Sequence, residues 1–189
     1  MPIRTKTKSP LTVMPQFWSY TIFSTDLGYM AMAGDEQMLQ WLTIGHKSAA
    51  IARKSLVESI REHAPDVHLR EQPGWNEKLT QRLIDYAGGF PDDFLDAEVP
   101  YPTQPFAAKV ARQCREIPYG QTLSYGELAA KAGSSNAARA VGNTMACNRL
   151  PLIIPCHRVL ASGGAIGGYS AAGGLTLKQR LLDLETGNS

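Results

Sequence analysis

A cysteine and a histidine stand side by side in the segment Pro155-Cys156-His157-Arg158-Val159. Thiolate is the reactive form of cysteine, and a neighbouring base increases its fraction. The apolar run Leu152-Ile153-Ile154 predicts a buried strand that delivers the thiol, and the polar pair after Cys156 indicates that the chain leaves the core there. A buried cysteine at a strand end is usually inert, but these neighbours make Cys156 a candidate nucleophile.

A Cys/His pair fits three classes of chemistry: hydrolysis, thiol redox reactions and group transfer. A hydrolase also needs a positioned water, an oxyanion hole and a residue that orients the histidine. The pair alone leaves all three classes open.

A pair of short helices is predicted upstream of this segment. Ser124 and Glu127 form a capping box, in which each side chain bonds the backbone N–H of the other residue. Gly133 is expected to end this helix in a left-handed conformation. Ser134 or Ser135 then caps a second helix over residues 136–147, and the pair predicts a DNA-reading helix-turn-helix.

The second helix opens with small side chains around one arginine, in Ala137-Ala138-Arg139-Ala140-Val141-Gly142. Small side chains let a helix lie close to a nucleic-acid groove, where Arg139 could reach between bases. They equally let the helix pack tightly on a neighbour, with Arg139 in solvent. Chemistry on an extruded base would explain both this helix pair and Cys156.

A Gly-rich loop, residues 162–170, follows the cysteine and could form a pocket wall. Tyr169 offers a flat face there, and Ser170 offers hydrogen bonds. The last predicted helix, residues 175–185, carries leucines on one face. By composition alone its Glu185 would be a solvated acid.

The first half of the chain predicts a small α+β unit. Its expected elements are a hairpin of residues 17–23 and 29–32, a strand at 38–44, a helix at 47–63, a possible strand at 66–70 and a helix at 75–86. Residues 90–103 form a proline-rich loop and the best domain boundary. Pro105 then starts a helix with Cys114 on its apolar face. We expect a disordered lead-in over residues 1–15, one domain over 16–99 and another over 100–189.

Composition gives the broad class. The 189 residues are 43% hydrophobic and 19% charged, which is typical of soluble globular proteins. No apolar stretch reaches the ~18 residues of a membrane span, and the basic start lacks the apolar region of a secretory signal. Residues 1–103 carry 10 Lys and Arg against 13 Asp and Glu, whereas residues 104–189 carry 9 against 4. The basic second half suggests a polyanionic partner.

The three cysteines form no paired framework, which favours reduced thiols in a cytosol-like compartment. Cys114 and Cys147 are predicted to be buried packing residues. The histidines are scattered and Cys-x-x-Cys is absent, so no zinc site is predicted. We expect no metal or cofactor.

The chain resembles the O6-alkylguanine-DNA alkyltransferases over about residues 104–187. The motifs that carry this resemblance, in the family's order, are Ile117-Pro118-Tyr119-Gly120, Ser124-Tyr125-Gly126-Glu127, Ala138-Arg139-Ala140-Val141-Gly142, Asn148, Pro151, Pro155-Cys156-His157-Arg158-Val159, Gly168-Tyr169-Ser170 and the terminal Leu-Leu-x-x-Glu. The first half resembles the family's N-terminal domain loosely, through its element order. The resemblance implies an α+β protein with a small ribonuclease-H-like domain, followed by a mostly helical domain with a winged helix-turn-helix motif.

The resemblance also implies catalytic roles. Cys156 would take the alkyl group from guanine O6 and keep it as a thioether. His157 would draw the thiol proton through a water, and Glu185 would orient and charge the histidine. Tyr125 would crowd a backbone phosphate and donate a proton to the guanine. Asn148 would tie the recognition helix to the cysteine segment.

The remaining implied roles concern binding. Arg139 resembles the finger that replaces the extruded base in the stack. Val159 would contact the purine amine through its backbone, and Tyr169 and Ser170 would form the pocket wall and the donor to O6. The other implied contacts are Pro151 for the substrate and Ala137, Ala138, Ala140 and Gly142 for DNA.

The implied function is direct reversal of O6-alkylguanine damage in double-stranded DNA, with O4-alkylthymine accepted less readily. A thioether has no easy route back, so each molecule acts once. The alternative is an alkylated-DNA-sensing module or regulator without transfer activity. We expect a monomer that binds DNA and no membrane, in the cytoplasm, or in the nucleus of a eukaryote. Two departures from the family pattern are the extra Ala171-Ala172 after Ser170, and Arg149-Leu150 after Asn148.

Overall fold

The first half of the chain contains a four-stranded sheet. The computed structural model describes residues 16–36 and 38–187, and the predicted lead-in over residues 1–15 lies outside them. Strands β1, β2 and β3 are antiparallel, and β4 adds to β1 in parallel, which gives the order β3-β2-β1-β4. Their bounds are Gln16–Thr25 (β1), Gly28–Asp35 (β2), Met38–His46 (β3) and Val67–Glu71 (β4). The predicted hairpin, third strand and fourth strand are confirmed.

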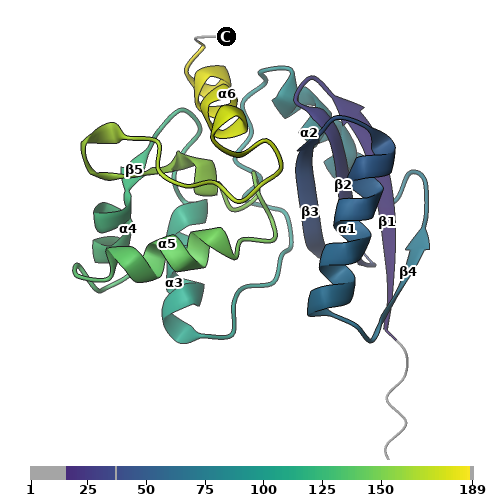
Figure 1. The fold of residues 1–189 in the computed structure, drawn as a ribbon, viewed down its shortest axis with the longest axis horizontal. Coiled ribbons are helices and arrows are strands. Elements are labelled where there is room, and N and C mark those ends of the chain that lie inside the picture. The colour runs from purple at the N-terminus through teal and green to yellow at the C-terminus, as the bar shows by residue number, and fades with distance from the viewer. Residues whose placement is uncertain (1–15, 37, 188–189) are drawn as a thin grey trace, which may run out of the picture.

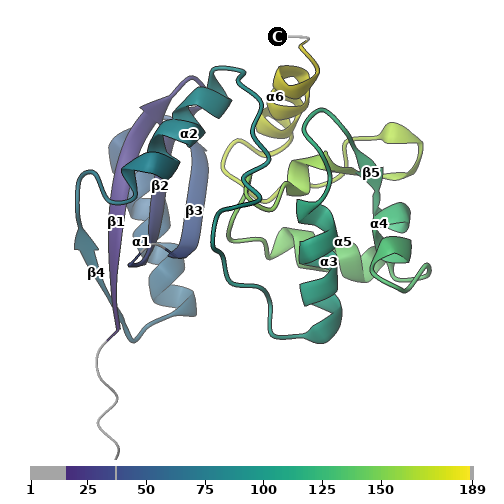
Figure 2. The same cartoon turned by 180° about the vertical axis from the view of Figure 1, so that it is seen from behind.

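The two faces of this sheet bury different side chains. Met30 and Met32 lie in the core shared with α2 (Glu77–Ala87), whereas Ala31 and Ala33 lie in the core beneath α1 (Ala49–His63). Successive residues of a strand point to opposite faces, which explains this division. The two helices therefore cover opposite faces of the sheet, α1 toward the viewer in Figure 1 and α2 toward the viewer in Figure 2.

The second half is mainly helical. Pro105 occupies the start of α3 as predicted, and the capping box of Ser124 and Glu127 is present at the start of α4. Gly133, with φ +90°, leads into the turn before α5. The elements are α3 (Pro105–Arg115), β5 (Leu123–Ser124), α4 (Tyr125–Lys131), α5 (Ala138–Ala146), β6 (Val159–Leu160) and α6 (Gly174–Thr186), with 3-10 turns at Cys156–Arg158 and Ser162–Gly164.

Two predictions about α5 are wrong. The helix begins at Ala138, and no serine caps it, because Ala137 is its N-cap residue and the Ser134 carbonyl accepts the Ala137 N–H within the preceding turn. Cys147, predicted to be buried, is exposed because it terminates the helix at its C-cap. Cys114 is fully buried, as predicted.

The predicted strand before Cys156 is also wrong. Residues 152–154 are buried, but they form a turn in which the Ile154 N–H donates to the Leu150 carbonyl at 2.8 Å. Leu152 has φ +72°, a left-handed conformation that no strand contains. Nor does the chain leave the core afterwards, since His157 and Arg158 are 0% and 1% exposed.

The two halves share one apolar core. It extends from Met30 and Leu42 of the sheet to Val110 of α3 and to Cys156. The Leu42 N–H donates to the Arg149 carbonyl at 2.9 Å, and a Cβ on Gly45 would lie 2.8 Å from the Ala172 carbonyl oxygen. The extra Ala171-Ala172 segment thus packs on the end of β3. Among the residues that the structure describes, no helix is long and apolar enough to span a bilayer.

Candidate active site

Asn148 fixes the position of the candidate nucleophile. Its Nδ2 donates to Cys156 Sγ at 3.2 Å and to the Ile154 carbonyl at 2.7 Å, while its Oδ1 accepts from the Leu150 N–H. Asn148 follows the C-cap residue of α5, and Cys156 opens the 3-10 turn. The side chain therefore joins α5 to the cysteine segment. Cys156 itself is 6% exposed.

His157 and Glu185 form a buried pair. His157 Nε2 lies 2.8 Å from Glu185 Oε1, and both side chains are at most 1% exposed. An ionised carboxylate only accepts hydrogen bonds, so Nε2 carries the proton and Nδ1 has a free lone pair. Nδ1 is buried and has no hydrogen-bond partner within residues 16–36 and 38–187. Burial lowers the pKa of His157, and Glu185 opposes that shift.

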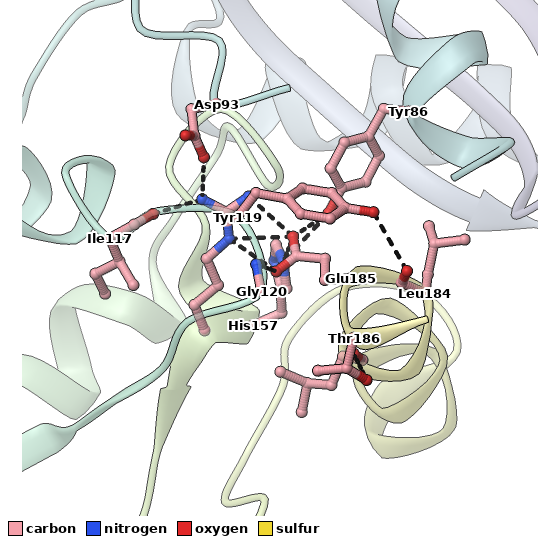
Figure 3. Close-up of polar contacts among 11 residues, drawn as sticks. Tyr86, Asp93, Ile117, Tyr119, Gly120, His157, Leu184, Glu185 and Thr186 are labelled. Atoms are coloured by element: carbon pink, nitrogen blue, oxygen red, sulfur yellow. Dashed lines mark hydrogen bonds and ion pairs between the residues drawn. The ribbon is translucent and has the colours of Figure 1, made fainter. Parts of the chain in front are cut away.

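Several donors converge on the Glu185 carboxylate. Oε1 accepts from the Tyr86 hydroxyl and from Arg158 Nη2 at 2.9 Å, and Oε2 accepts from the Gly120 N–H at 3.1 Å (Figure 3). Burial alone would favour the neutral acid, but His157 and Arg158 outweigh it and hold the pKa of Glu185 at about 2. The carboxylate is therefore ionised throughout the physiological range.

Arg158 carries the compensating charge. Its Nη1 donates to Asp93 Oδ1 at 2.9 Å and to the Ile117 carbonyl, and its Nε lies 3.0 Å from Glu185 Oε2. Burial by itself would lower the pKa of this guanidinium, but Glu185 reverses the shift and raises it. A buried arginine with this many acceptors is a satisfied ion pair rather than an isolated charge.

Lys178 supplies a second buried cation near the thiol. Its Nζ donates to the Val159 carbonyl at 2.7 Å, and the residue is fully buried. Burial raises the pKa of Cys156, whereas the Asn148 hydrogen bond and the charge of Lys178 lower it. The site thus shields a neutral thiol from solvent while providing groups that favour its ionised form.

Two tyrosines of the predicted site, Tyr125 and Tyr169, lie near Cys156. Tyr169 has a buried hydroxyl that finds no partner in the described part of the chain, and burial together with the nearby Cys156 raises its pKa well above the usual value. Burial and Cys156 also raise the pKa of Tyr125, which is half-buried at the start of α4. A Cβ on Gly167 would lie 3.3 Å from the Tyr125 ring, so the Gly-rich loop faces this tyrosine. Ser170 on the same loop is exposed.

The other predicted residues lie at the neighbouring surface and turn. Arg139 is exposed on α5, next to exposed Ala140 and half-buried Ala138. Most of the predicted DNA contacts thus lie at the start of α5, whereas Tyr125 lies at the start of α4. The remaining predicted positions are half-buried Ala137 and Gly142, and the buried Pro151 in the turn before Cys156.

Three polar residues around this site, Tyr86, Asp93 and Lys178, were not predicted from the sequence. The structural role of Arg158 was not predicted either. Lys178 had a usable signal, because it stands three residues before Leu181 and seven before Glu185, on the buried face of α6. Tyr86 and Asp93 had none, since their contacts join residues 65 to 99 positions apart.

Comparison with known proteins identifies this arrangement. The family model described as "6-O-methylguanine DNA methyltransferase, DNA binding domain" matches residues 105–187. A methylated-DNA–protein-cysteine methyltransferase of Methanosarcina acetivorans is 32% identical over 166 residues, which cover 88% of this chain and 97% of the relative. The human protein of the same name is 33% identical, over 86% of this chain and 77% of its own.

A solved structure agrees with these sequence matches. The crystal structure of Mycobacterium tuberculosis OGT in complex with DNA superimposes with a TM-score of 0.73 at 29% identity, over 90% of this chain and 94% of that one. The similarity therefore includes the sheet of the first half as well as the helical second half. The chain belongs to the methylated-DNA–protein-cysteine methyltransferase family.

Proposed function

We propose that this protein repairs DNA by direct reversal, moving an alkyl group from O6 of guanine to Cys156. The observation that carries the proposal is the buried constellation of Cys156, Asn148, His157 and Glu185, in which a held thiol adjoins a histidine with one free nitrogen. The family's relatives are named for the same transfer to a cysteine.

The reaction is an in-line displacement at the alkyl carbon. The thiol proton passes through a water to His157 Nδ1, and the resulting imidazolium is stabilised by Glu185, whose carboxylate stays ionised. The sulfur–carbon bond forms as the carbon–O6 bond breaks, and the electron pair of that bond remains on the purine. Tyr125 donates the proton that neutralises the purine anion. No oxyanion hole is required.

DNA binding is assigned to α4 and α5. We infer that they form a helix-turn-helix in which α5 enters the groove, since its exposed start combines small side chains with Arg139. Arg139 fills the gap left by the extruded base, and Tyr169, Ser170, Val159 and Pro151 line the pocket that receives it.

The domain assignment follows from the same family likeness. Residues 16–99 form a ribonuclease-H-like domain, supported by an antiparallel sheet with one parallel edge strand and a helix on each face. Residues 100–189 form the DNA-binding and transfer domain. One copy of the chain holds the whole catalytic group, so a monomer suffices. It works wherever the genome lies, in the cytoplasm or a nucleus.

Intact-mass measurement tests the proposed function. After incubation with duplex DNA that carries O6-methylguanine, the protein mass should rise by one CH2 unit, at one equivalent and no more, because the thioether blocks further reaction. Tight binding without a mass change would identify a damage-sensing module instead. Turnover of an ester or amide beyond one equivalent would identify a thiol hydrolase.

Arg139 gives a test of base extrusion. In Arg139→Ala, transfer from O6-methylguanine in duplex DNA should slow by roughly ten- to a hundredfold, because the opened stack is no longer filled. Transfer from free O6-benzylguanine should stay within about twofold, since no stack has to open. Lys131→Ala removes an exposed cation from α4 and serves as the control for lost charge. An equal loss on both substrates would make Arg139 a structural residue.

A further inference from the structure

The groups that bond the Glu185 carboxylate form a cluster, here called the Glu185 cluster. One of them belongs to the first half of the chain and has no assigned role. Tyr86 lies on α2, outside the segment that the family model matches, and is fully buried. Its hydroxyl donates to Glu185 Oε1, and the same hydroxyl oxygen lies 3.4 Å from His157 Nε2 (Figure 3). A phenol group from the other half of the molecule therefore touches the His157–Glu185 pair directly.

The direction of these hydrogen bonds follows from the protonation of the partners. Glu185 is ionised and can only accept, so the Tyr86 hydroxyl donates to it. His157 Nε2 donates to the same oxygen, Oε1. The two donors therefore converge on one acceptor, and each limits where the other can lie.

The rest of the molecule fixes the Tyr86 ring. It packs against Phe94 with a centroid distance of 5.6 Å and against the edge of Tyr119 at 5.8 Å. Helix α2 carries it on the same buried face as Leu79 and Leu83. A buried ring packed between two aromatic neighbours has little rotational freedom, so its hydroxyl holds a fixed position relative to the carboxylate.

Arg158 pairs with both oxygens of the carboxylate. Its Nε and Nη2 both lie within 3.1 Å of Glu185, in the fork arrangement that favours bidentate pairing with both oxygens. This pair includes Oε1, the oxygen that faces His157, and Oε2 also accepts the Gly120 N–H. A tilt of the carboxylate that keeps these contacts would still move Oε1 relative to His157 Nε2. The Tyr86 hydroxyl bonds Oε1 next to His157 and opposes that tilt.

We propose that Tyr86 is a positioning residue for alkyl transfer, holding Glu185 Oε1 against His157 Nε2 so that Nδ1 remains the free base. The proposal rests on the proposed function of the site. It also means that the first half of the chain helps to position the catalytic pair, because Tyr86 lies on α2. Loss of the hydroxyl leaves Glu185 in place on Arg158 and Gly120 but frees its orientation toward the histidine.

Tyr86→Phe and Tyr119→Phe form a matched pair of variants. Each removes one phenolic hydroxyl that bonds α6, since the Tyr119 hydroxyl donates to the Leu184 carbonyl at 3.3 Å, but Tyr119 has no bond to the carboxylate. Single-turnover transfer from free O6-benzylguanine should slow about tenfold or more in Tyr86→Phe, because the base is misplaced, and should stay within about twofold in Tyr119→Phe.

A spectroscopic readout separates positioning from loss of structure. In the unsubstituted protein, the 15N shifts of His157 should show one tautomer, with the proton on Nε2, and Tyr86→Phe should show a mixture. A wild-type rate with an unchanged tautomer in Tyr86→Phe overturns the proposal, as does an equal slowing in Tyr119→Phe.

The unsubstituted protein provides a test that needs no variant. Its Tyr86 hydroxyl proton should resonate downfield, exchange slowly with water and show a nuclear Overhauser effect to the His157 Nε2 proton. Absence of that effect overturns the proposal even if Tyr86→Phe fails to fold. Neither NMR readout requires alkyl transfer. A protein that transfers no alkyl group therefore contradicts the proposed function, while the two NMR readouts still test the position of Tyr86 against Glu185 and His157.

Discussion

Alkyl transfer should disappear in Cys156→Ala, while binding to duplex DNA persists. The thiol is the acceptor, so its removal leaves no atom to form the thioether. The fold should survive, because Asn148 Nδ2 keeps its bond to the Ile154 carbonyl, and a small truncation in the core costs about 1–2 kcal/mol. Label transfer from O6-methylguanine DNA, measured beside a gel-shift titration, checks both halves of this expectation.

The other two cysteines provide the controls for this variant. Cys147 is exposed and Cys114 is buried in α3, so Cys147→Ala tests an accessible thiol without disturbing the core. It should accept one alkyl group per protein as the unsubstituted chain does. If Cys156→Ala takes up label, or if Cys147→Ala fails to take it up, then Cys156 is not the alkyl acceptor.

Glu185→Gln should abolish rapid transfer and destabilise the protein by about 3–5 kcal/mol. The substitution removes the negative charge that pairs with Arg158 and places an amide among groups that donate to it, including the Tyr86 hydroxyl and the Gly120 N–H. Within the described part of the chain, Arg158 is then buried with Asp93 as its one anionic partner, and that carboxylate is 35% exposed. Urea unfolding and single-turnover kinetics measure the two effects.

The same cluster predicts a pH dependence of stability. The pKa of Glu185 is held at about 2 in the folded protein, below its ordinary value of 4.5. The stabilisation is therefore complete above pH 4.5 and is lost as the pH falls toward 2, with a total of about 3 kcal/mol. The stability gap between the unsubstituted protein and Glu185→Gln should narrow by roughly 2 kcal/mol between about pH 6 and pH 3.

Asp183→Asn is the control for this experiment, because Asp183 lies on the same helix and bonds Gln179 rather than the cluster. Its stability should run parallel to that of the unsubstituted protein across the same range. A constant gap for Glu185→Gln would mean that folding does not lower the pKa of the Glu185 carboxyl.

Local patterns were enough to predict most elements. The aromatic and β-branched residues of β1, the capping box at Ser124 and the proline at the start of α3 are short-range signals that tertiary packing did not override. The apolar run of residues 152–154 failed because a short buried run fits a strand and a buried turn equally well. Nothing in the residue types marks the left-handed Leu152, since leucine rarely adopts that conformation.

Some residues of the candidate site could likewise be predicted from local sequence, and others could not. Cys156 and His157 were visible as neighbours in the chain, whereas Glu185 emerged only through the family resemblance, because composition predicts a solvated acid there. The burial of Arg158 and Lys178 runs against the usual exposure of cations and depends on acceptors supplied by distant segments. Tyr86 and Asp93 could not be predicted, since only the folded chain brings α2 and the loop after it to α6.

The Glu185 cluster also limits how the halves of this protein can be recombined with those of its relatives. Residues 105–187 include Cys156, His157, Arg158 and Glu185, but the Tyr86 hydroxyl and the Asp93 carboxylate come from the other half. A chimera that joins this segment to the first half of another family member needs a tyrosine and an acid at the corresponding places. Without them, the transplanted segment would carry its nucleophile beside a carboxylate and a guanidinium that have each lost a partner.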